Sequence, residues 1–211
     1  KLLFFEHFGI IIVTFFCNYI IPFMGFGVRG VYLKHKHGLA YKDFSQSLIG
    51  VIVIEWSIFA LIAVIAAAAL FTAGQPISYL LVLLMVGILC GFVFLFAVRP
   101  SWVPGFLPLS GVAKRVLTDW QSYVGHRRAL SRVAFYTFLE AICFALAFVV
   151  AYKALFPEIP AAASVFASAL SDLSLIIRIL PASAGSLEGA LQLAMSPYGL
   201  AFNDNLSVAL I

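Results

Sequence analysis

Charged residues are scarce in this chain of 211 residues. Lys and Arg number 13, Asp and Glu number 9, and together they make up 10% of the sequence, whereas hydrophobic residues make up 64%. Soluble domains carry about 25% charged and about 45–50% apolar residues. So few polar side chains cannot cover a water-facing surface. The composition therefore excludes an ordinary soluble domain and predicts a protein embedded in a lipid bilayer.

Cysteine is also rare, and the spacings of metal and redox sites are missing. Cys17, Cys90 and Cys143 all lie in apolar runs, which is typical of small buried hydrophobic residues. His35 and His37 have no third ligand nearby in the sequence. No Ser/His/Asp or Cys/His constellation is present either. The sequence therefore predicts no metal, no cofactor and no nucleic-acid partner, and it favours a role other than catalysis.

What the chain has in abundance is long hydrophobic runs. A membrane-spanning helix needs ~20 such residues. Five runs qualify, and a sixth begins near residue 206; the five are 8–24, 48–71, 77–98, 133–152 and 161–180. They predict an all-α, polytopic transmembrane bundle that forms a single domain over residues 1–211. Because the chain starts at Lys1 and ends inside an apolar run, we expect it to be a fragment of a longer protein.

The basic residues indicate an orientation. Ten of the 13 Lys and Arg lie in two connections, 25–47 and 99–132. Five crossings put both connections on one face, and the positive-inside rule predicts that this face is cytoplasmic, in the inner membrane. Within the second connection, Trp120 and Tyr123 fall on one side of a basic amphipathic helix. Such a helix is expected in the headgroup layer, and the alternative is a solvated loop helix.

The stretch IIPFMGFGVRG contains a G-x-G-x-x-G pattern made by Gly25, Gly27 and Gly30. A dinucleotide site would need a strand before it, but a membrane-helix pattern precedes it here. Pro22 and the three glycines instead predict a helix break where the backbone turns sharply. Arg29 beside the break is suited to bind a phosphate. The alternative is an interfacial arginine that extends to lipid phosphates.

Four charges fall within the predicted spans: Glu55, Glu140, Asp172 and Arg178. Each costs ~2.5–3.5 kcal/mol to insert, so each is expected to face the bundle interior or a partner. In the last span, serines at 164, 168, 171 and 174 share a face with Arg178. That face either packs closely against other helices or lines a polar path.

A second break follows this span. Pro181 and Gly185 predict a turn, and Ser186 begins a new helical periodicity with Glu188 in its first turn. The simpler interpretation is a capped helix. The alternative is a short re-entrant helix that presents Ser186 and Glu188 to a headgroup cavity, as in transporters built from discontinuous helices.

The two breaks together resemble a known family. The pattern N-x3-P-F-x-G-x-G-x-R-G-x-Y-L-K, followed by HGLAYKDF and later by LPASAGSLEGAL, is similar to the transmembrane region of lysylphosphatidylglycerol synthases and their flippase-like relatives. The resemblance implies a helical bundle with re-entrant segments that moves lipid headgroups between leaflets. The positions it carries over are Pro22, Gly25, Arg29, Pro181, Gly185 and Glu188. Met24 and Gly27 depart from the family pattern. The family's aminoacyl-transferring enzymes have a separate catalytic domain, which has no counterpart in this sequence.

The leading hypothesis is a membrane protein that binds and translocates an anionic phospholipid or a polyprenyl-phosphate-linked lipid. Arginines would attract the phosphate, and the acidic residues would counter a cationic group or relay protons. The predicted substrate-binding residues are Arg29, Glu55, Asp172, Arg178, Ser186 and Glu188, and the predicted hinge residues are Pro22, Gly25, Gly27, Gly30, Pro181 and Gly185. The alternatives are the membrane part of an aminoacyl-phosphatidylglycerol synthase and a scaffold without transport. Homo-oligomerisation is left open.

Overall fold

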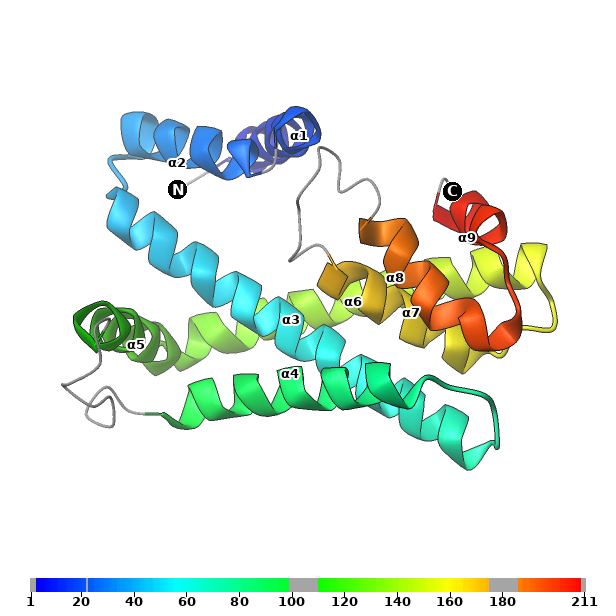
Figure 1. The fold of residues 1–211 in the computed structure, drawn as a ribbon. Helices are drawn as coiled ribbons and strands as arrows, with labels where there is room; N and C mark the ends of the chain where they lie inside the picture. The colour runs from blue at the N-terminus through cyan, green and yellow to red at the C-terminus, as the bar shows by residue number, and fades with distance from the viewer. Residues whose placement is uncertain (1–2, 22, 99–109, 175–185, 210–211) are drawn as a thin grey trace.

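The fold is known from a computed structural model that describes residues 3–21, 23–98, 110–174 and 186–209. Within these ranges every regular element is a helix, which confirms the predicted all-α bundle (Figure 1). The helices are α1 (Phe4–Ile20), α2 (Met24–His37), α3 (Tyr41–Thr72), α4 (Tyr79–Ala97), α5 (Ser110–Gly125), α6 (Arg127–Leu155), α7 (Ala161–Ser174), α8 (Ser186–Met195), the 3-10 turn η3 (Ser196–Tyr198) and α9 (Phe202–Ala209). Four residues singled out in the sequence lie outside the described ranges: Pro22, Arg178, Pro181 and Gly185.

Three of these helices, α3, α4 and α6, are long and apolar enough to cross a membrane. The runs at 48–71 and 133–152 become helices of 32 and 29 residues, because the polar residues beside each run continue the same helix. The run at 77–98 corresponds closely to α4. At 1.5 Å per residue α6 is ~43 Å long, enough for the hydrocarbon core and both headgroup layers. α1 and α7 are apolar but shorter, at 17 and 14 residues.

α1 and α2 pack against each other as an antiparallel hairpin. Near the start of α1, Glu6 accepts a hydrogen bond of 2.8 Å from Tyr32 in the second half of α2. Near the end of α1, Asn18 accepts one of 2.8 Å from the Gly25 N–H at the start of α2. These bonds at opposite ends of the pair require that the chain reverses between the helices. The segment 25–47 was predicted to be a loop, and this is wrong, because most of it is α2 and the start of α3.

The reversal takes place between the end of α1 at Ile20 and the start of α2 at Met24, and Phe23 there adopts a left-handed backbone with φ 65°. The helix is therefore broken where the sequence predicts it. The glycines do not make the break, however, since Gly25, Gly27 and Gly30 all lie inside α2. Their predicted role in turning the backbone is wrong. Two of them serve packing instead, because Gly25 lies against α1 and Gly30 lies against a side chain of α3.

The core of the bundle is centred on α7, which packs against α3, α6 and α8. Ala60 and Ala63 of α3 and Ala167 and Ala169 of α7 are fully buried. Small side chains at these positions let the two backbones approach closely, which is how membrane helices gain packing energy without a hydrophobic driving force. Larger side chains such as Phe166 and Met195 fill the surrounding space.

α7 and α8 form a second packed pair, and hydrogen bonds fix the direction of α8. Tyr152, near the end of α6, donates to Asn205 of α9 at 3.0 Å. Asn205 in turn donates to Gln192, near the end of α8, at 2.9 Å. The end of α8 is thus held beside the end of α6, close to where α7 begins. α8 therefore runs back toward the end of the bundle from which α7 starts.

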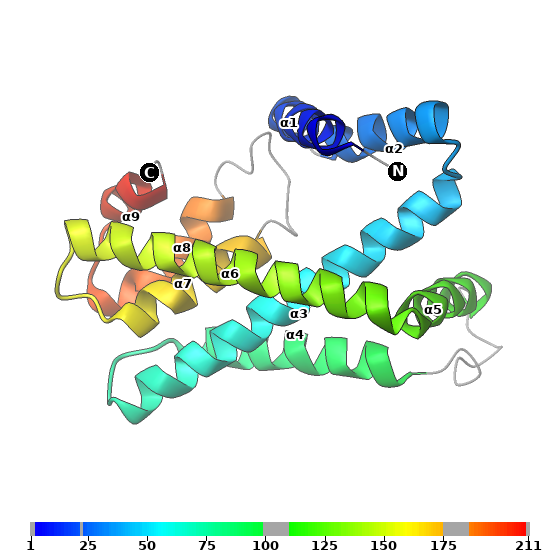
Figure 2. The same cartoon turned by 180° about the vertical axis from the view of Figure 1, so that it is seen from behind.

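The α1–α2 hairpin lies beside the start of α3, and the α7–α8 pair lies toward the opposite end of the bundle (Figures 1 and 2). The α1–α2 hairpin is joined directly to the start of α3, and the α7–α8 pair follows directly on the end of α6. α3 and α6 run in the same direction, since α4 returns the chain between them. α2 and α8, at 14 and 10 residues, are too short to cross a hydrocarbon core that needs ~20.

α5 lies at the end of the bundle where α3 and α6 begin. Trp120 donates from its ring nitrogen to the Leu95 carbonyl near the end of α4 at 3.0 Å, and Tyr123 lies against Gly50 of α3. The described parts of both basic segments therefore share one end, as predicted, while its cytoplasmic location stays a prediction. Trp120 is buried against protein, and the location of this helix in the headgroup layer stays a prediction.

Candidate functional site

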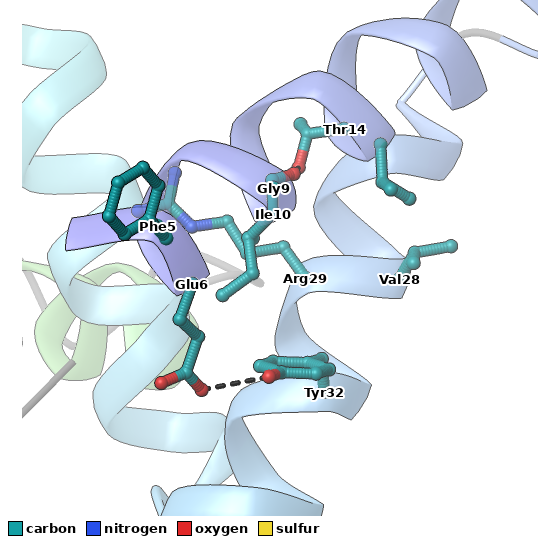
Figure 3. A pocket seen from close by; sticks show the side chains of 9 residues that line it. Phe5, Glu6, Gly9, Ile10, Thr14, Val28, Arg29 and Tyr32 are labelled. Carbon is teal, nitrogen blue, oxygen red and sulfur yellow. Dashed lines mark hydrogen bonds between the residues drawn. The ribbon is translucent and has the colours of Figure 1, made fainter. Parts of the chain in front are cut away.

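A groove of about 310 Å³ runs between α1 and α2 (Figure 3). Its walls are mainly apolar side chains from both helices, and its polar side chains are Glu6, Thr14, Arg29 and Tyr32. Thr14 is occupied by its own helix, because its hydroxyl donates to the Ile10 carbonyl at 2.7 Å. The groups that remain to define the chemistry of the groove are therefore a carboxylate, a guanidinium and a phenol.

Close approach of the two helices depends on Gly25. A Cβ atom there would lie 2.1 Å from the Thr14 carbonyl oxygen and 2.8 Å from the Asn18 amide oxygen. The Asn18 side chain also accepts the Gly25 N–H, one of the backbone donors that the start of α2 leaves without a helical partner. Asn18 and Gly25 therefore join the hairpin at its closed end, and the helices are held side by side along the groove.

At the open end of the hairpin, one carboxylate gathers three donors. Glu6 Oε1 accepts from Tyr32 at 2.8 Å, lies 2.7 Å from His37 Nε2 and lies 3.1 Å from Lys36 Nζ. The bond to His37, followed by those to Tyr32 and Lys36, lowers the pKa of Glu6 from 4.5 to about 2. Hydrogen bonds to Tyr32 and then to Glu6 raise the pKa of Lys36. These four residues are called the Glu6 cluster below; the Glu6 carboxylate is ionised at neutral pH and paired within the cluster.

Arg29 lines the same groove and has no partner in the described part of the chain. Its side chain is partly buried, and within the described residues it makes no salt bridge or hydrogen bond. Figure 3 shows the guanidinium beside Phe5, separated from the Glu6 carboxylate, which faces Tyr32. The carboxylate that could neutralise Arg29 is thus engaged by the Glu6 cluster. Arginine keeps its charge at any physiological pH, so the groove holds a fixed cation.

Such an arrangement suits an anion with several oxygens. The guanidinium presents its donors as a planar fork that matches phosphate or carboxylate in a two-point contact. An apolar surrounding strengthens that contact because it screens charge less than water does. The apolar walls of the groove can at the same time accommodate the hydrocarbon part of a lipid.

The acidic site residues lie on other helices. Ala66 of α3 and Val165 of α7 line one small apolar groove, which sets the register of these antiparallel helices. Measured from that level along the helix axes, Glu55 lies ~16 Å and Asp172 ~10 Å toward the basic end of the bundle, which is the end where α3 and α6 begin. The two carboxylates therefore differ in depth by about one helical turn. Both side chains are partly buried. Their association in one polar site stays a prediction.

α8 begins at Ser186 and carries Glu188 in its first turn, as the sequence predicts. Both side chains are partly buried, and α8 packs against α7. The groove that contains Arg29 is lined by residues of α1 and α2 alone. The structure thus places Arg29 in one site, Asp172 on α7, and Glu55, Ser186 and Glu188 on the helices packed against α7.

The serine face of α7 is packed inside the protein. Ser164, Ser168 and Ser171 are fully buried, and Ser168 donates to the Val165 carbonyl of its own helix at 2.8 Å. In the described part of the chain, the Ser164 and Ser171 hydroxyls find no hydrogen-bond partner. Of the two interpretations left open by the sequence, this burial favours close helix packing over a polar path.

Glu140, like the other charges in the spans, was expected to face either the bundle interior or a partner. It lies near the middle of α6 on an exposed part of the helix surface, so it does not face the bundle interior. Thr137, Ala141 and Ala145, which are buried, mark the inward face of α6.

Two sets of polar residues escaped the sequence analysis. One is Glu6 with Tyr32, although Glu6 is the sole acidic residue before Asp43 in a strongly basic stretch, and this signal could have drawn attention to it. The other is the buried network of Tyr152, Asn205 and Gln192. These residues are far apart in the sequence, and no spacing links them.

Comparison with known proteins gives one match. The family model for the lysylphosphatidylglycerol synthase TM region matches residues 1–211, the whole chain. Neither the curated proteins nor the solved structures gave a significant match. Two motifs carry the resemblance to this family. In the structure, the first corresponds to the antiparallel hairpin that contains Arg29, and the second to the short helix that starts at Ser186. The chain is an integral membrane protein and belongs to the family of lysylphosphatidylglycerol synthase transmembrane regions.

Proposed function

We propose that this chain binds the phosphate of an anionic lipid at Arg29, in the groove between α1 and α2, and moves the headgroup across the cytoplasmic membrane. The lipid is an anionic phospholipid or a polyprenyl-phosphate-linked lipid, and the shared chemistry is a phosphate on an apolar tail. The basic end of the bundle faces the cytoplasm, which follows from the positive-inside rule.

The observation that carries the proposal is the partly buried Arg29 with no partner among the described residues. A buried cation is costly unless an anion neutralises it. Glu6, the carboxylate that lines the same groove, already accepts hydrogen bonds from its own cluster. An anion from outside the protein is therefore the natural partner, and anionic headgroups are abundant where a membrane protein works.

Translocation is supported by the α1–α2 hairpin and the α7–α8 pair, which join the bundle at opposite ends. Re-entrant and discontinuous helices let polar groups enter the membrane while the surrounding helices satisfy their backbone. Arg29 would receive the headgroup from the basic end. Glu55, Asp172 and Glu188, with Ser186, would then balance its charge on the path toward the opposite end.

The test uses purified protein in liposomes that contain a fluorescent anionic lipid. Binding is measured first, and reduction of the label by an impermeant reagent then reports its movement between leaflets. Arg29→Ala should weaken binding about ten- to a hundredfold, the range for a charged hydrogen-bonded contact. Lys34→Ala is the matched control, since Lys34 lies exposed on the same helix. Equal binding by the Arg29→Ala variant and the wild type would refute the assignment of Arg29 as the phosphate-binding residue.

The test also separates the lipid classes and the two stages. Phosphatidylglycerol, a polyprenyl phosphate and zwitterionic phosphatidylcholine are compared in parallel, and phosphatidylcholine should bind weakly. Glu188→Gln should leave binding at Arg29 intact and slow translocation. If Arg29→Ala and Glu188→Gln both move lipid at the wild-type rate, the proposed path is wrong. Binding without movement in the wild type would refute translocation and leave a lipid-binding role, as in the membrane part of a lipid-modifying synthase.

A further inference from the structure

Glu6 and Arg29 line the same groove with opposite charges. Within the described residues, Glu6 makes its polar contacts with the other members of the Glu6 cluster. Figure 3 shows its carboxylate turned toward Tyr32, while the guanidinium of Arg29 lies beside Phe5. In this arrangement the carboxylate of the groove leaves the cation of the groove available to a ligand.

The cation nevertheless lies within side-chain reach of the carboxylate. Arg29 and Tyr32 are three residues apart in α2, which separates them by ~4.5 Å along the axis and puts them on one face of the helix. Tyr32 donates to Glu6 Oε1 at 2.8 Å, so the carboxylate lies about one helical turn along α2 from the level of Arg29. Rotation about side-chain bonds can therefore bring the two charged groups together while the helices stay in place.

Glu6 depends on its donors because its side chain is only 12% exposed. A carboxylate shielded to this degree needs hydrogen-bond donors or a cation in place of water. Tyr32 supplies one donor directly, and it also accepts a hydrogen bond of 2.9 Å from Lys36 Nζ, which keeps that ammonium group beside the carboxylate. If these contacts are lost, the guanidinium in the same groove can replace them.

We propose that Glu6 competes with the lipid phosphate for Arg29, and that Tyr32 is the positioning residue that holds this competitor away. The inference rests on the proposed function. While Glu6 is held in its cluster, Arg29 can bind the phosphate; once Glu6 pairs with Arg29, the phosphate is displaced. The exchange offers a route to release the headgroup, because one anion replaces another and the partly buried cation stays neutralised. The apparent affinity for lipid then scales with the fraction of protein in which Arg29 is available.

The experiment measures binding of fluorescent phosphatidylglycerol to the full-length protein in liposomes. Tyr32→Phe removes the hydroxyl and should weaken binding about tenfold, the lower end of the range for a hydrogen bond to a charged group. Glu6→Ala removes the competitor, so it should bind the lipid at least as tightly and release it more slowly. The double variant should recover the affinity that Tyr32→Phe loses. Tyr19→Phe is the matched control, since it removes an exposed hydroxyl from the same hairpin.

These variants separate competition from a structural role. Tyr32→Phe and Glu6→Ala break the same hydrogen bond across the hairpin. A purely structural contact would give the same loss of binding in both and no recovery in the double variant, and that result would overturn the proposal. His37→Ala provides a second pair, because it removes a 2.7 Å partner of Glu6 from outside the groove. Its loss of affinity should also be recovered by Glu6→Ala, and a persistent loss counts against competition.

Failure of the proposed function gives a different pattern. In that case Arg29→Ala binds lipid as the wild type does, whatever the behaviour of Tyr32→Phe. If Arg29→Ala weakens binding and Tyr32→Phe does not, phosphate binding stands and competition by Glu6 is refuted. In the Arg29→Ala background, Tyr32→Phe should have no further effect, because the cation for which Glu6 competes is gone.

Discussion

Replacing Gly25 and Gly27 by alanine should change stability in opposite directions, although the two glycines stand two residues apart in one helix. At Gly25 the new Cβ would lie 2.1 Å from the Thr14 carbonyl oxygen, a backbone atom that no side-chain rotation can move. The helices must separate by about 1 Å, which forfeits a quarter to a half of the attraction at each contact. Overpacking of this kind costs about 1–3 kcal/mol, and the Asn18 hydrogen bond is stretched as well.

At Gly27 nothing lies within 4 Å of the added Cβ. The alanine there should stabilise α2 by up to about 1 kcal/mol, since glycine is the poorer helix former. The variants are compared by thermal unfolding in nanodiscs and by hydrogen exchange, in which the Gly25→Ala protein should lose protection along α2. Gly30→Ala is an intermediate case, because its Cβ would lie 3.1 Å from the Phe44 ring, and Phe44→Leu should rescue it. Equal effects of the changes at 25 and 27 would refute close packing of the hairpin.

Three further predictions follow from the polar contacts. Tyr152→Phe leaves the buried side-chain oxygen of Asn205, Oδ1, without its 3.0 Å donor and should lower the free energy of unfolding by about 1–3 kcal/mol. Chemical denaturation measures this, and an unchanged value would exclude a stabilising network. The pKa of Glu6 is lowered from 4.5 to about 2, so its contribution to stability is complete above pH 4.5 and is lost as the pH falls toward 2. In the Glu6→Gln variant the melting temperature should depend less on pH over that interval. If the dependence stays as steep as in the wild type, other titrating groups cause it. Trp120→Phe removes the donor to the Leu95 carbonyl and should speed proteolysis between α4 and α5. An unchanged rate would show that other contacts hold α5 in place.

The sequence predicted α3, α4 and α6 because lipid imposes a simple rule: a long apolar run must satisfy its own backbone and therefore forms a helix. Helix ends were less predictable. α3 begins at Tyr41 and α6 at Arg127, several residues before their apolar runs, because leaving the hydrocarbon layer does not by itself end a helix. The break before Met24 was predicted from its proline and glycines, but the glycines were assigned the wrong role.

The direction of α2 could not be predicted from hydropathy, because it depends on pairwise contacts. The signal was present in α1, where Thr14 and Asn18 form a polar stripe at helical spacing, opposite Gly25 in the folded hairpin. Arg29 was identified from its motif, whereas its lack of an acidic partner required coordinates. The Glu6 cluster joins residues from both arms of the hairpin, so no local pattern reveals it.

The bonds at both ends of the α1–α2 hairpin have a mechanical consequence. Hydrogen bonds at Asn18 and at Glu6 connect the two helices at both ends, and residues 38–40 join the pair to α3. We therefore expect the pair to move as one rigid body about this short connection. A lipid bound at Arg29 would move with it, and the contact between Gly30 and Phe44 would resist the motion.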